Sequence, residues 1–221
     1  MMPKRKVVVF DLDDTLFKEI DYLRSAFRAI ADEIKARFGI PHLYEEMLAC
    51  WEDGQDVFGT LISKYHLPWT VDDLLRRYRE HVPTLQLDAE TVHLLETLRQ
   101  SCVLGIITDG RSVTQRHKIT ALGLEAFFKP DHILISEETG TSKLSPESFK
   151  WFMDHYPDHL YYYIGDNPQK DFVCPNRLGW QTICLKNDGR NIHPQDFSLA
   201  EAYLPGRVFQ RMRDIEQFLM A

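Results

Sequence analysis

The stretch Lys6-Val-Val-Val-Phe-Asp-Leu-Asp-Asp-Thr15 decides the fold, because an apolar run passes directly into three carboxylates. The run from Val7 to Phe10 holds no polar residue, which is typical of a strand that is covered on both faces in a parallel sheet. Asp11, Asp13 and Asp14 follow at once. The stretch therefore predicts a buried strand whose carboxyl end carries a polar site.

Further apolar runs along the chain are expected to be strands. They cover residues 102–108, 132–135, 161–165 and 181–185. Stretches of helical character lie between them, at residues 112–122, 145–155 and 170–178. Strands and helices in alternation are typical of an α/β fold, in which right-handed crossovers place helices on both faces of a parallel sheet. The chain is therefore expected to form a three-layer α/β structure.

Residues 19–82 contain no strand-like run and are expected to form a helical insert. Apolar residues at three- and four-residue steps indicate its first helix: Ile20, Leu23, Phe27, Ile30, Ile34 and Phe38. Similar spacing predicts helices over 57–65 and 71–78, with breaks at 39–41 and 67–68.

The insert divides the chain into two expected units. The core is predicted to consist of residues 1–17 and 86–221, and an all-helical cap of residues 18–85. The last segment, residues 208–220, is predicted to be an amphipathic helix that packs on the core. The apolar side of this helix would carry Val208, Met212, Ile215 and Leu219.

Composition excludes several classes of protein. With 44% hydrophobic and 27% charged residues, the 221-residue chain is ordinary for a soluble globular protein, which excludes disorder and fibrous structure. The net charge of −7 argues against nucleic-acid binding through broad phosphate neutralisation. No stretch approaches the roughly 18–20 apolar residues of a membrane span. The apolar run after Lys6 is too short for a signal peptide, and no Cys-x-x-Cys pair occurs. We therefore expect a cytoplasmic protein with reduced cysteines.

Polar residues gather where the predicted strands end. Asp11 and Asp13 follow the first strand, Thr108-Asp109-Gly110 the second, and Asp166 a later one, with Asp171 further on. Ligands of an open parallel sheet bind outside the carboxyl ends of its strands. Carboxylates collected there repel one another unless a cation or protons offset their charge, and Mg²⁺ suits such oxygen ligands. Lys143, in the loop of residues 140–146, supplies a second positive charge.

Each of these residues also has a purely structural explanation. A single Asp after a strand is commonly a helix N-cap or a turn residue, and Lys143 alone would be an ordinary surface lysine. Asp171 alone would complement a helix dipole. The joint pattern favours a site, because four separate segments deliver suitable groups to the same edge of the predicted sheet.

At these positions the chain resembles the haloacid dehalogenase-like hydrolase superfamily. Asp11-Leu-Asp13-Asp14-Thr15 is similar to its first motif, Asp-x-Asp-x-Thr, and Thr108 with Asp109 and Gly110 is similar to the second. Lys143 stands where the third motif has its lysine, and Gly165-Asp166-x-x-x-x-Asp171 resembles the acidic fourth. The resemblance covers the whole chain and implies a Rossmann-like core with a helical cap inserted after the first strand.

The chain departs from the family pattern at two positions. Leu144 follows Lys143 where proline is common, and the proline is delayed to Pro146. Asp109 stands where asparagine is frequent, so only its backbone is expected to donate a hydrogen bond. Neither departure removes a required group.

The resemblance implies that Asp11 is a nucleophile that attacks phosphorus and that Asp13 is the general acid and base. An acid at position 13 is typical of the phosphatase branch, because a halide leaving group needs no proton. The resemblance also implies that Mg²⁺ is held by the Asp11 and Asp166 carboxylates and the Asp13 carbonyl. Asp171 would orient the shell around the metal.

Phosphate binding is implied for the remaining motif residues. Lys143 would contact both the nucleophile and the phosphoryl oxygens, while the Thr108 hydroxyl and the amide of Asp109 or Gly110 would bind one oxygen. Cap residues are candidates for reading the leaving group, and the sequence does not select among them. These are Tyr22, Arg24, Trp51, Gln55, Arg76, Arg77 and Arg79.

The leading hypothesis is a magnesium-dependent phosphatase of a small phosphorylated metabolite, such as a sugar phosphate or a nucleotide, acting as a monomer or small homo-oligomer. A phosphosugar mutase would use the same Asp11 and Asp13 but protect the phosphoenzyme from water. A ligand-binding protein without catalysis is the third reading.

Overall fold

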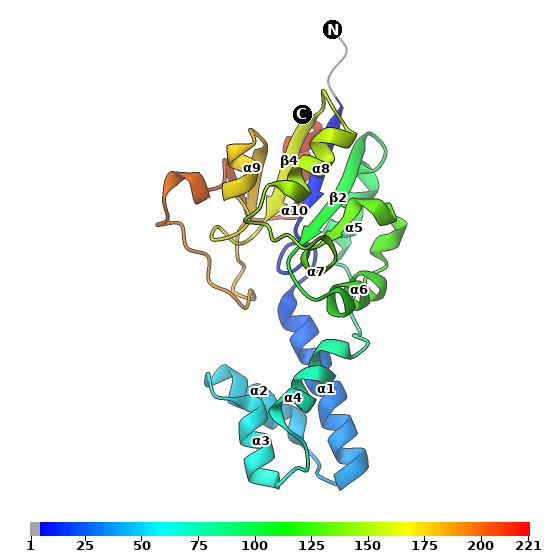
Figure 1. The fold of residues 1–221 in the computed structure, drawn as a ribbon, viewed down its shortest axis with the longest axis vertical. Coiled ribbons are helices and arrows are strands. Elements are labelled where there is room, and N and C mark those ends of the chain that lie inside the picture. Colours follow the sequence, from blue (N-terminus) through cyan, green and yellow to red (C-terminus); the bar gives the residue numbers. More distant parts are fainter. Residues whose placement is uncertain (1–4) are drawn as a thin grey trace.

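The computed structural model describes residues 5–221, and its core is a six-stranded parallel sheet (Figure 1). The strands are β1 (Lys6–Phe10), β2 (Cys102–Thr108), β3 (Ile133–Ile135), β4 (Leu160–Gly165), β5 (Gln181–Leu185) and β6 (Arg207–Phe209). Their order in space is β3-β2-β1-β4-β5-β6, and every neighbouring pair is parallel. The predicted α/β class and parallel sheet are confirmed.

Strand β1 lies at the centre because all four residues from Val7 to Phe10 are apolar and fully buried. Phe10 is in register with Ile106 of β2 and with Ile164 of β4. The three strands therefore end within two residues of one another, which brings the polar residues that follow them to one edge of the sheet.

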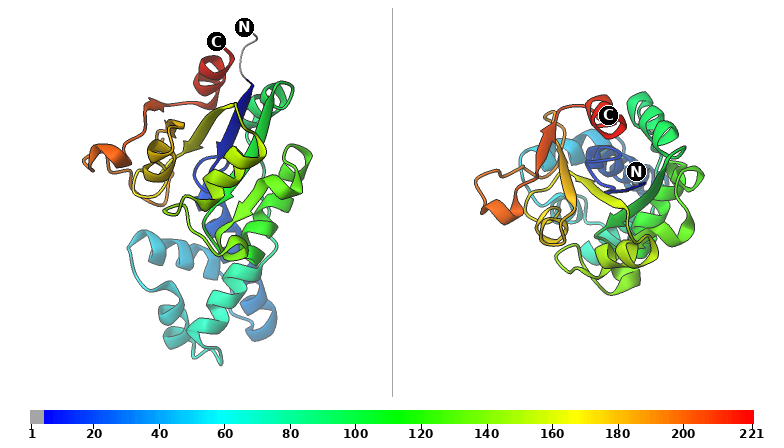
Figure 2. Two further views of the ribbon diagram at one scale, coloured as in Figure 1. Left: turned by 45° about the horizontal axis from the view of Figure 1, so that its top comes forward. Right: turned by 90° about the horizontal axis from the view of Figure 1, so that it is seen from above.

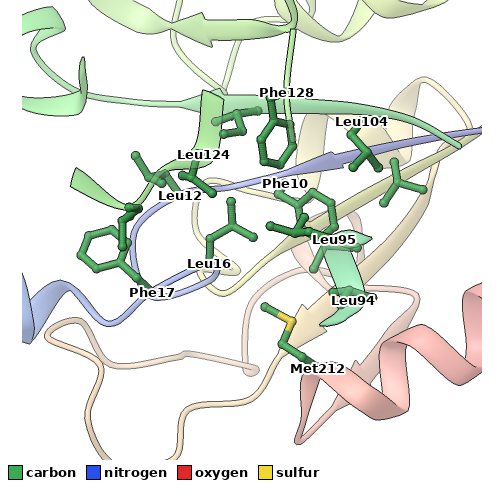
Figure 3. Packing of buried hydrophobic residues seen from close by; sticks show 14 of the residues in the cluster. Phe10, Leu12, Leu16, Phe17, Leu94, Leu95, Leu104, Leu124, Phe128 and Met212 are labelled. Atoms are coloured by element: carbon green, nitrogen blue, oxygen red, sulfur yellow. The ribbon is translucent and has the colours of Figure 1, made fainter. Parts of the chain in front are cut away.

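Helices cover both faces of the sheet, so that the structure has three layers (Figure 2). Val8 and Phe10 face a cluster that includes Leu94 and Leu95, and Figure 3 shows its close packing. Val7 and Val9 face the opposite cluster with Phe149, Phe152 and Trp180. The core helices are α5 (Ala89–Leu98), α6 (Ser112–Ala121), α7 (Ser136–Thr139), α8 (Glu147–His155), α9 (Val173–Arg177) and α10 (Met212–Met220).

Four helices follow β1 and form a group of their own beyond the carboxyl end of the sheet (Figure 1). They are α1 (Glu19–Phe38), α2 (Leu43–Glu52), α3 (Val57–Tyr65) and α4 (Val71–Glu80). They enclose a separate hydrophobic cluster, to which α1 contributes the buried side chains at its predicted three- and four-residue steps. Phe38 is the exception, because it is 38% exposed and packs edge-on against Trp69.

Several elements differ from the prediction. Helices α2 and α5 were not predicted, and the predicted closing helix begins only at Met212, where α10 starts. Val208 lies in β6 instead, paired with Cys184 of β5, and is 45% exposed. Met212, Ile215 and Leu219 are buried as predicted. No helix among residues 5–221 is long and apolar enough to cross a membrane.

Candidate active site

A cavity of about 130 Å³ lies where β1, β2 and β4 end. Seven of its lining side chains are carboxylates, and two are lysines. The lining residues are Asp11, Asp13, Asp14, Glu19, Asp109, Lys143, Asp166, Asn167, Lys170, Asp171 and His193. The predicted site residues are thus brought together, apart from Thr108 and Gly110, which do not line the cavity.

Asp11 is the buried carboxylate at the end of β1. Lys143 Nζ lies 2.5 Å from its Oδ1, and the backbone N–H of Leu12 donates to the same oxygen at 2.6 Å. Burial raises the pKa of Asp11 well above its ordinary value, and the neighbouring Asp171 and Asp166 add to this although Lys143 opposes it. The single positive charge of Lys143 therefore does not offset the negative charge of the carboxylates around it.

Lys143 is buried between two carboxylates. Its Nζ donates to Asp171 Oδ1 at 2.8 Å as well as contacting Asp11. Burial lowers the pKa of Lys143, but the two carboxylates outweigh this and raise it well above its ordinary value. The lysine therefore remains charged, and it reaches Asp11 although Leu144 stands where proline was expected.

Asp171 organises the loop that follows β4. It is fully buried, and its Oδ2 accepts the backbone N–H groups of Asp166 at 3.0 Å and Asn167 at 2.8 Å. A Cβ on Gly165 would lie 2.5 Å from this oxygen, so only glycine allows the close approach. Because this loop extends beyond Asp171, the helix predicted over 170–178 is shorter than expected, and α9 begins only at Val173.

Asp11, Asp166 and Asp171 could together hold a metal ion. Each offers one oxygen, and these oxygens lie within 4.8 Å of one another. Burial, with Asp171 and Asp14 nearby, raises the pKa of Asp166 to about 8. Three buried carboxyl groups whose oxygens lie this close together match a hard divalent cation with oxygen ligands.

Asp13 is held by two residues of α6 that the sequence analysis missed. Lys118 Nζ donates to its Oδ1 at 2.6 Å, and Gln115 Nε2 donates to its Oδ2 at 2.8 Å. Both donors are buried. Gln115 and Lys118 are three positions apart and so share one helix face, but polar residues at that spacing predict a solvated face. No signal in the sequence marked this face as buried.

The second motif lies beside this network. Thr108 is 1% exposed, and its hydroxyl oxygen accepts a hydrogen bond from Gln115 Nε2 at 2.7 Å. The Asp109 and Gly110 amides were the two candidates for binding a phosphoryl oxygen. The Gly110 N–H already donates to the Ser136 hydroxyl at 2.9 Å. The Asp109 side chain has a role that was not predicted, because its Oδ1 accepts from the Lys143 N–H at 3.0 Å.

None of the seven cap candidates lines the cavity. Tyr22 is buried and donates its hydroxyl to the Tyr78 carbonyl, while Arg77 pairs with Glu33 and stacks on Trp69. Glu19, at the start of α1, lines the cavity instead. Burial, and then repulsion from Asp13, raises the pKa of Glu19 to about 7 although Lys118 opposes it.

The loop between β5 and β6 closes the site from the core side. Asn191 donates from Nδ2 to Asp166 Oδ2 at 2.8 Å and accepts on Oδ1 from Lys18 Nζ at 2.8 Å. The Ile192 N–H donates to Asp14 Oδ2 at 3.1 Å, while its side chain packs against the hydrophobic cluster enclosed by α1 to α4. One loop therefore touches a candidate metal ligand and the start of α1 together.

The chain is similar to several known proteins. The haloacid dehalogenase-like hydrolase family matches residues 8–185. The chain is 27% identical over 210 residues to the glyceraldehyde 3-phosphate phosphatase of Methanocaldococcus jannaschii, covering 87% of this chain and 90% of that protein. It is 23% identical over 238 residues to the phosphoserine phosphatase of Thermus thermophilus, covering 86% and 91%.

Solved structures share the fold. The HAD-hydrolase YfnB of Bacillus subtilis, in a crystal structure bound to magnesium, matches 99% of this chain and 100% of its own, with a TM-score of 0.67 and 21% identity. The sheet, the flanking helices and the group of helices after β1 are thus an arrangement already seen in crystals.

Proposed function

The chain belongs to the haloacid dehalogenase-like hydrolase family, and we propose that it is a magnesium-dependent phosphatase that hydrolyses a small phosphomonoester through an aspartyl-phosphate on Asp11. One observation carries the proposal. The Asp11 carboxylate, 2.5 Å from Lys143 Nζ, lies among Asp166 and Asp171 in a small acidic cavity. The arrangement joins a nucleophile, a fixed cation and room for a second cation.

Asp11 carries out the first displacement. One of its carboxylate oxygens attacks phosphorus, so that a bond forms between aspartate and the phosphoryl group while the bond to the leaving oxygen breaks. Lys143 offsets the charge that collects on the phosphoryl oxygens. Because phosphoryl transfer depends chiefly on positioning and charge stabilisation, these two groups supply the attack and part of the charge stabilisation in this displacement.

Asp13 moves the protons. It donates a proton to the leaving oxygen in the first displacement, and it then removes one from the water that attacks the aspartyl-phosphate. Inorganic phosphate leaves and Asp11 is regenerated. Its place on the wall of the cavity supports this role.

The carboxylates of Asp11 and Asp166 and the carbonyl of Asp13 would hold Mg²⁺. The bound ion would supply positive charge beside the phosphoryl group and align it for attack. Asp171 keeps Lys143 and the loop amides in place. Thr108, the Asp109 amide and Lys143 are the proposed phosphate-binding groups.

The size of the cavity and the relatives bear on the substrate. A cavity of about 130 Å³ suits a compact leaving group better than a nucleoside. The two relatives described above are named for phosphorylated three-carbon compounds, although a further relative that matches 58% of this chain is named a pyrimidine 5'-nucleotidase. We therefore favour a small sugar phosphate or phosphorylated acid, with residues 18–85 acting as the cap over it.

A phosphate-release screen tests the proposal. Purified protein with Mg²⁺ is mixed with a panel of phosphorylated metabolites, and both free phosphate and isomerised ester are measured. Phosphate release that EDTA abolishes supports the phosphatase. Isomerised phosphosugar without free phosphate would indicate a mutase, and inactivity across the panel would favour a binding protein.

A further inference from the structure

We propose that Lys118 and Gln115 of α6 are positioning residues that aim the Asp13 carboxyl group at the leaving oxygen, an inference that rests on the proposed function. Together they engage both oxygens of Asp13. Lys118 Nζ lies 2.6 Å from Oδ1 and Gln115 Nε2 lies 2.8 Å from Oδ2. Two donors on two oxygens fix the rotation of the carboxyl plane.

The surroundings of Lys118 restrict its ammonium group to one place. The side chain is only 4% exposed, and a lysine is rarely buried unless it is paired. The Tyr22 ring centroid lies 4.4 Å from Nζ and the Phe17 centroid 5.8 Å. Glu19 Oε1 is 4.0 Å away. These partners hold the cation against Asp13 and offer it no water-exposed alternative.

Gln115 ties the same carboxylate to the end of β2. Its Nε2 also donates to the Thr108 hydroxyl oxygen at 2.7 Å. A Cβ on Gly110 would lie 3.0 Å from Gln115 Cδ, so the glycine lets the side chain pass. The amide therefore fixes the acid relative to the strand end where the phosphoryl group is expected.

The same helix also holds the cap. The Thr114 hydroxyl donates to the Arg79 carbonyl at 2.9 Å, and His117 Nδ1 lies 3.1 Å from the His81 carbonyl. Both carbonyls lie at the carboxyl-terminal end of α4. Helix α6 thus contacts both Asp13 and the end of α4 along one segment.

This role predicts a defect that depends on the leaving group. An alkoxide leaving group needs the Asp13 proton, whereas p-nitrophenolate leaves readily without one. A misoriented Asp13 carboxyl group should therefore slow the hydrolysis of an alkyl phosphate much more than that of p-nitrophenyl phosphate. A defect in packing alone would slow both substrates equally.

The test compares kcat/KM for glycerol phosphate and p-nitrophenyl phosphate, since this constant reports the steps through the first displacement. For Lys118→Met and Gln115→Met we expect a loss of about 100-fold with the alkyl ester, the low end of general-acid catalysis, and of less than about 3-fold with the aryl ester. Lys118→Arg should recover much of the loss. Arg116→Met is the control, because Arg116 lies on α6 but pairs with Glu138.

Each outcome decides between the two proposals. Wild type that hydrolyses both esters, with variants that lose activity equally on both, overturns the positioning role and leaves the phosphatase intact. Wild type that hydrolyses neither ester nor any panel member overturns both. Circular dichroism and thermal unfolding establish that the variants fold. If Lys118→Met does not fold, Gln115→Met supplies the answer.

Discussion

The Asp109 carboxylate accepts a hydrogen bond of 3.0 Å from the backbone N–H of Lys143. This bond joins the end of β2 to the loop that carries the buried lysine. It explains how Lys143 reaches Asp11 although Leu144 replaces the proline that is common at that position in the family.

Replacing Asp109 by alanine should loosen this loop. Without the acceptor, Lys143 loses the tether that fixes its backbone, and misplacement by about 1 Å costs up to about 100-fold in rate. We expect kcat/KM to fall about 10-fold or more in Asp109→Ala. Asp109→Asn keeps an acceptor oxygen and should retain most of the activity. Equal activity of Asp109→Ala and the exposed control Asp131→Ala would contradict this role.

Replacing Asn191 by alanine should weaken magnesium binding. Asn191 orients Asp166 and connects it to Lys18, and loss of such a supporting contact typically costs about 10–100-fold in metal affinity. We expect a loss of about 10-fold by isothermal titration calorimetry. Asp188→Ala is the matched control, since Asp188 contacts Lys18 without touching Asp166. Equal affinities in the two variants would refute the connection.

Removing one carboxylate of the acidic cavity should stabilise the metal-free protein. Because burial raises the pKa of Asp166 to about 8, its ionisation disfavours the native state at neutral pH. We expect Asp166→Asn to raise Tm in EDTA by roughly 2–4 °C, which corresponds to about 1 kcal/mol for a chain of this size. The stabilisation by Mg²⁺ seen in the wild type should disappear. A lower Tm in EDTA would contradict the account.

Glu19 should make stability fall as pH rises. Burial raises its pKa from 4.5 to about 7, so between these values the native state holds a proton that the unfolded state releases. Unfolding is then favoured by increasing pH, and stability is lost from about pH 4.5 to about pH 7. In Glu19→Gln the decline in the free energy of unfolding from pH 5 to pH 8 should be smaller by roughly 1–3 kcal/mol. Identical pH dependence by urea unfolding would rule out this contribution.

The sequence predicts five of the six strands, because each of these five is a short apolar run, and it does not predict β6. It predicts the residues that follow β1, β2 and β4 because parallel strands bring their carboxyl ends together. It fails at Val208, whose spacing from Met212 fits a helix as well as a strand. Short segments are ambiguous in this way, and pairing with β5 decides between the two.

The sequence also fails where burial is set by tertiary contacts. Lys118 and Gln115 look like a solvated helix face until Asp13, Tyr22 and Thr108 are seen around them. The prediction for the cap arginines is wrong in the opposite direction, because these residues were expected at the cavity and lie away from it. Arg76 and Arg77 pair with carboxylates of the same group of helices. Glu19, which does line the cavity, is not among the residues that the sequence marks as site candidates.

The central claim is that Asp11 becomes phosphorylated, and one measurement tests it directly. The protein is mixed with Mg²⁺ and a substrate, quenched, and reduced with borohydride, which converts an acyl phosphate to an alcohol. Peptide mass spectrometry then locates the modified residue. We predict reduction of Asp11 to homoserine in the wild type, and neither modification nor phosphate release in Asp11→Asn. Modification at another residue, or full turnover by Asp11→Asn, would contradict the account.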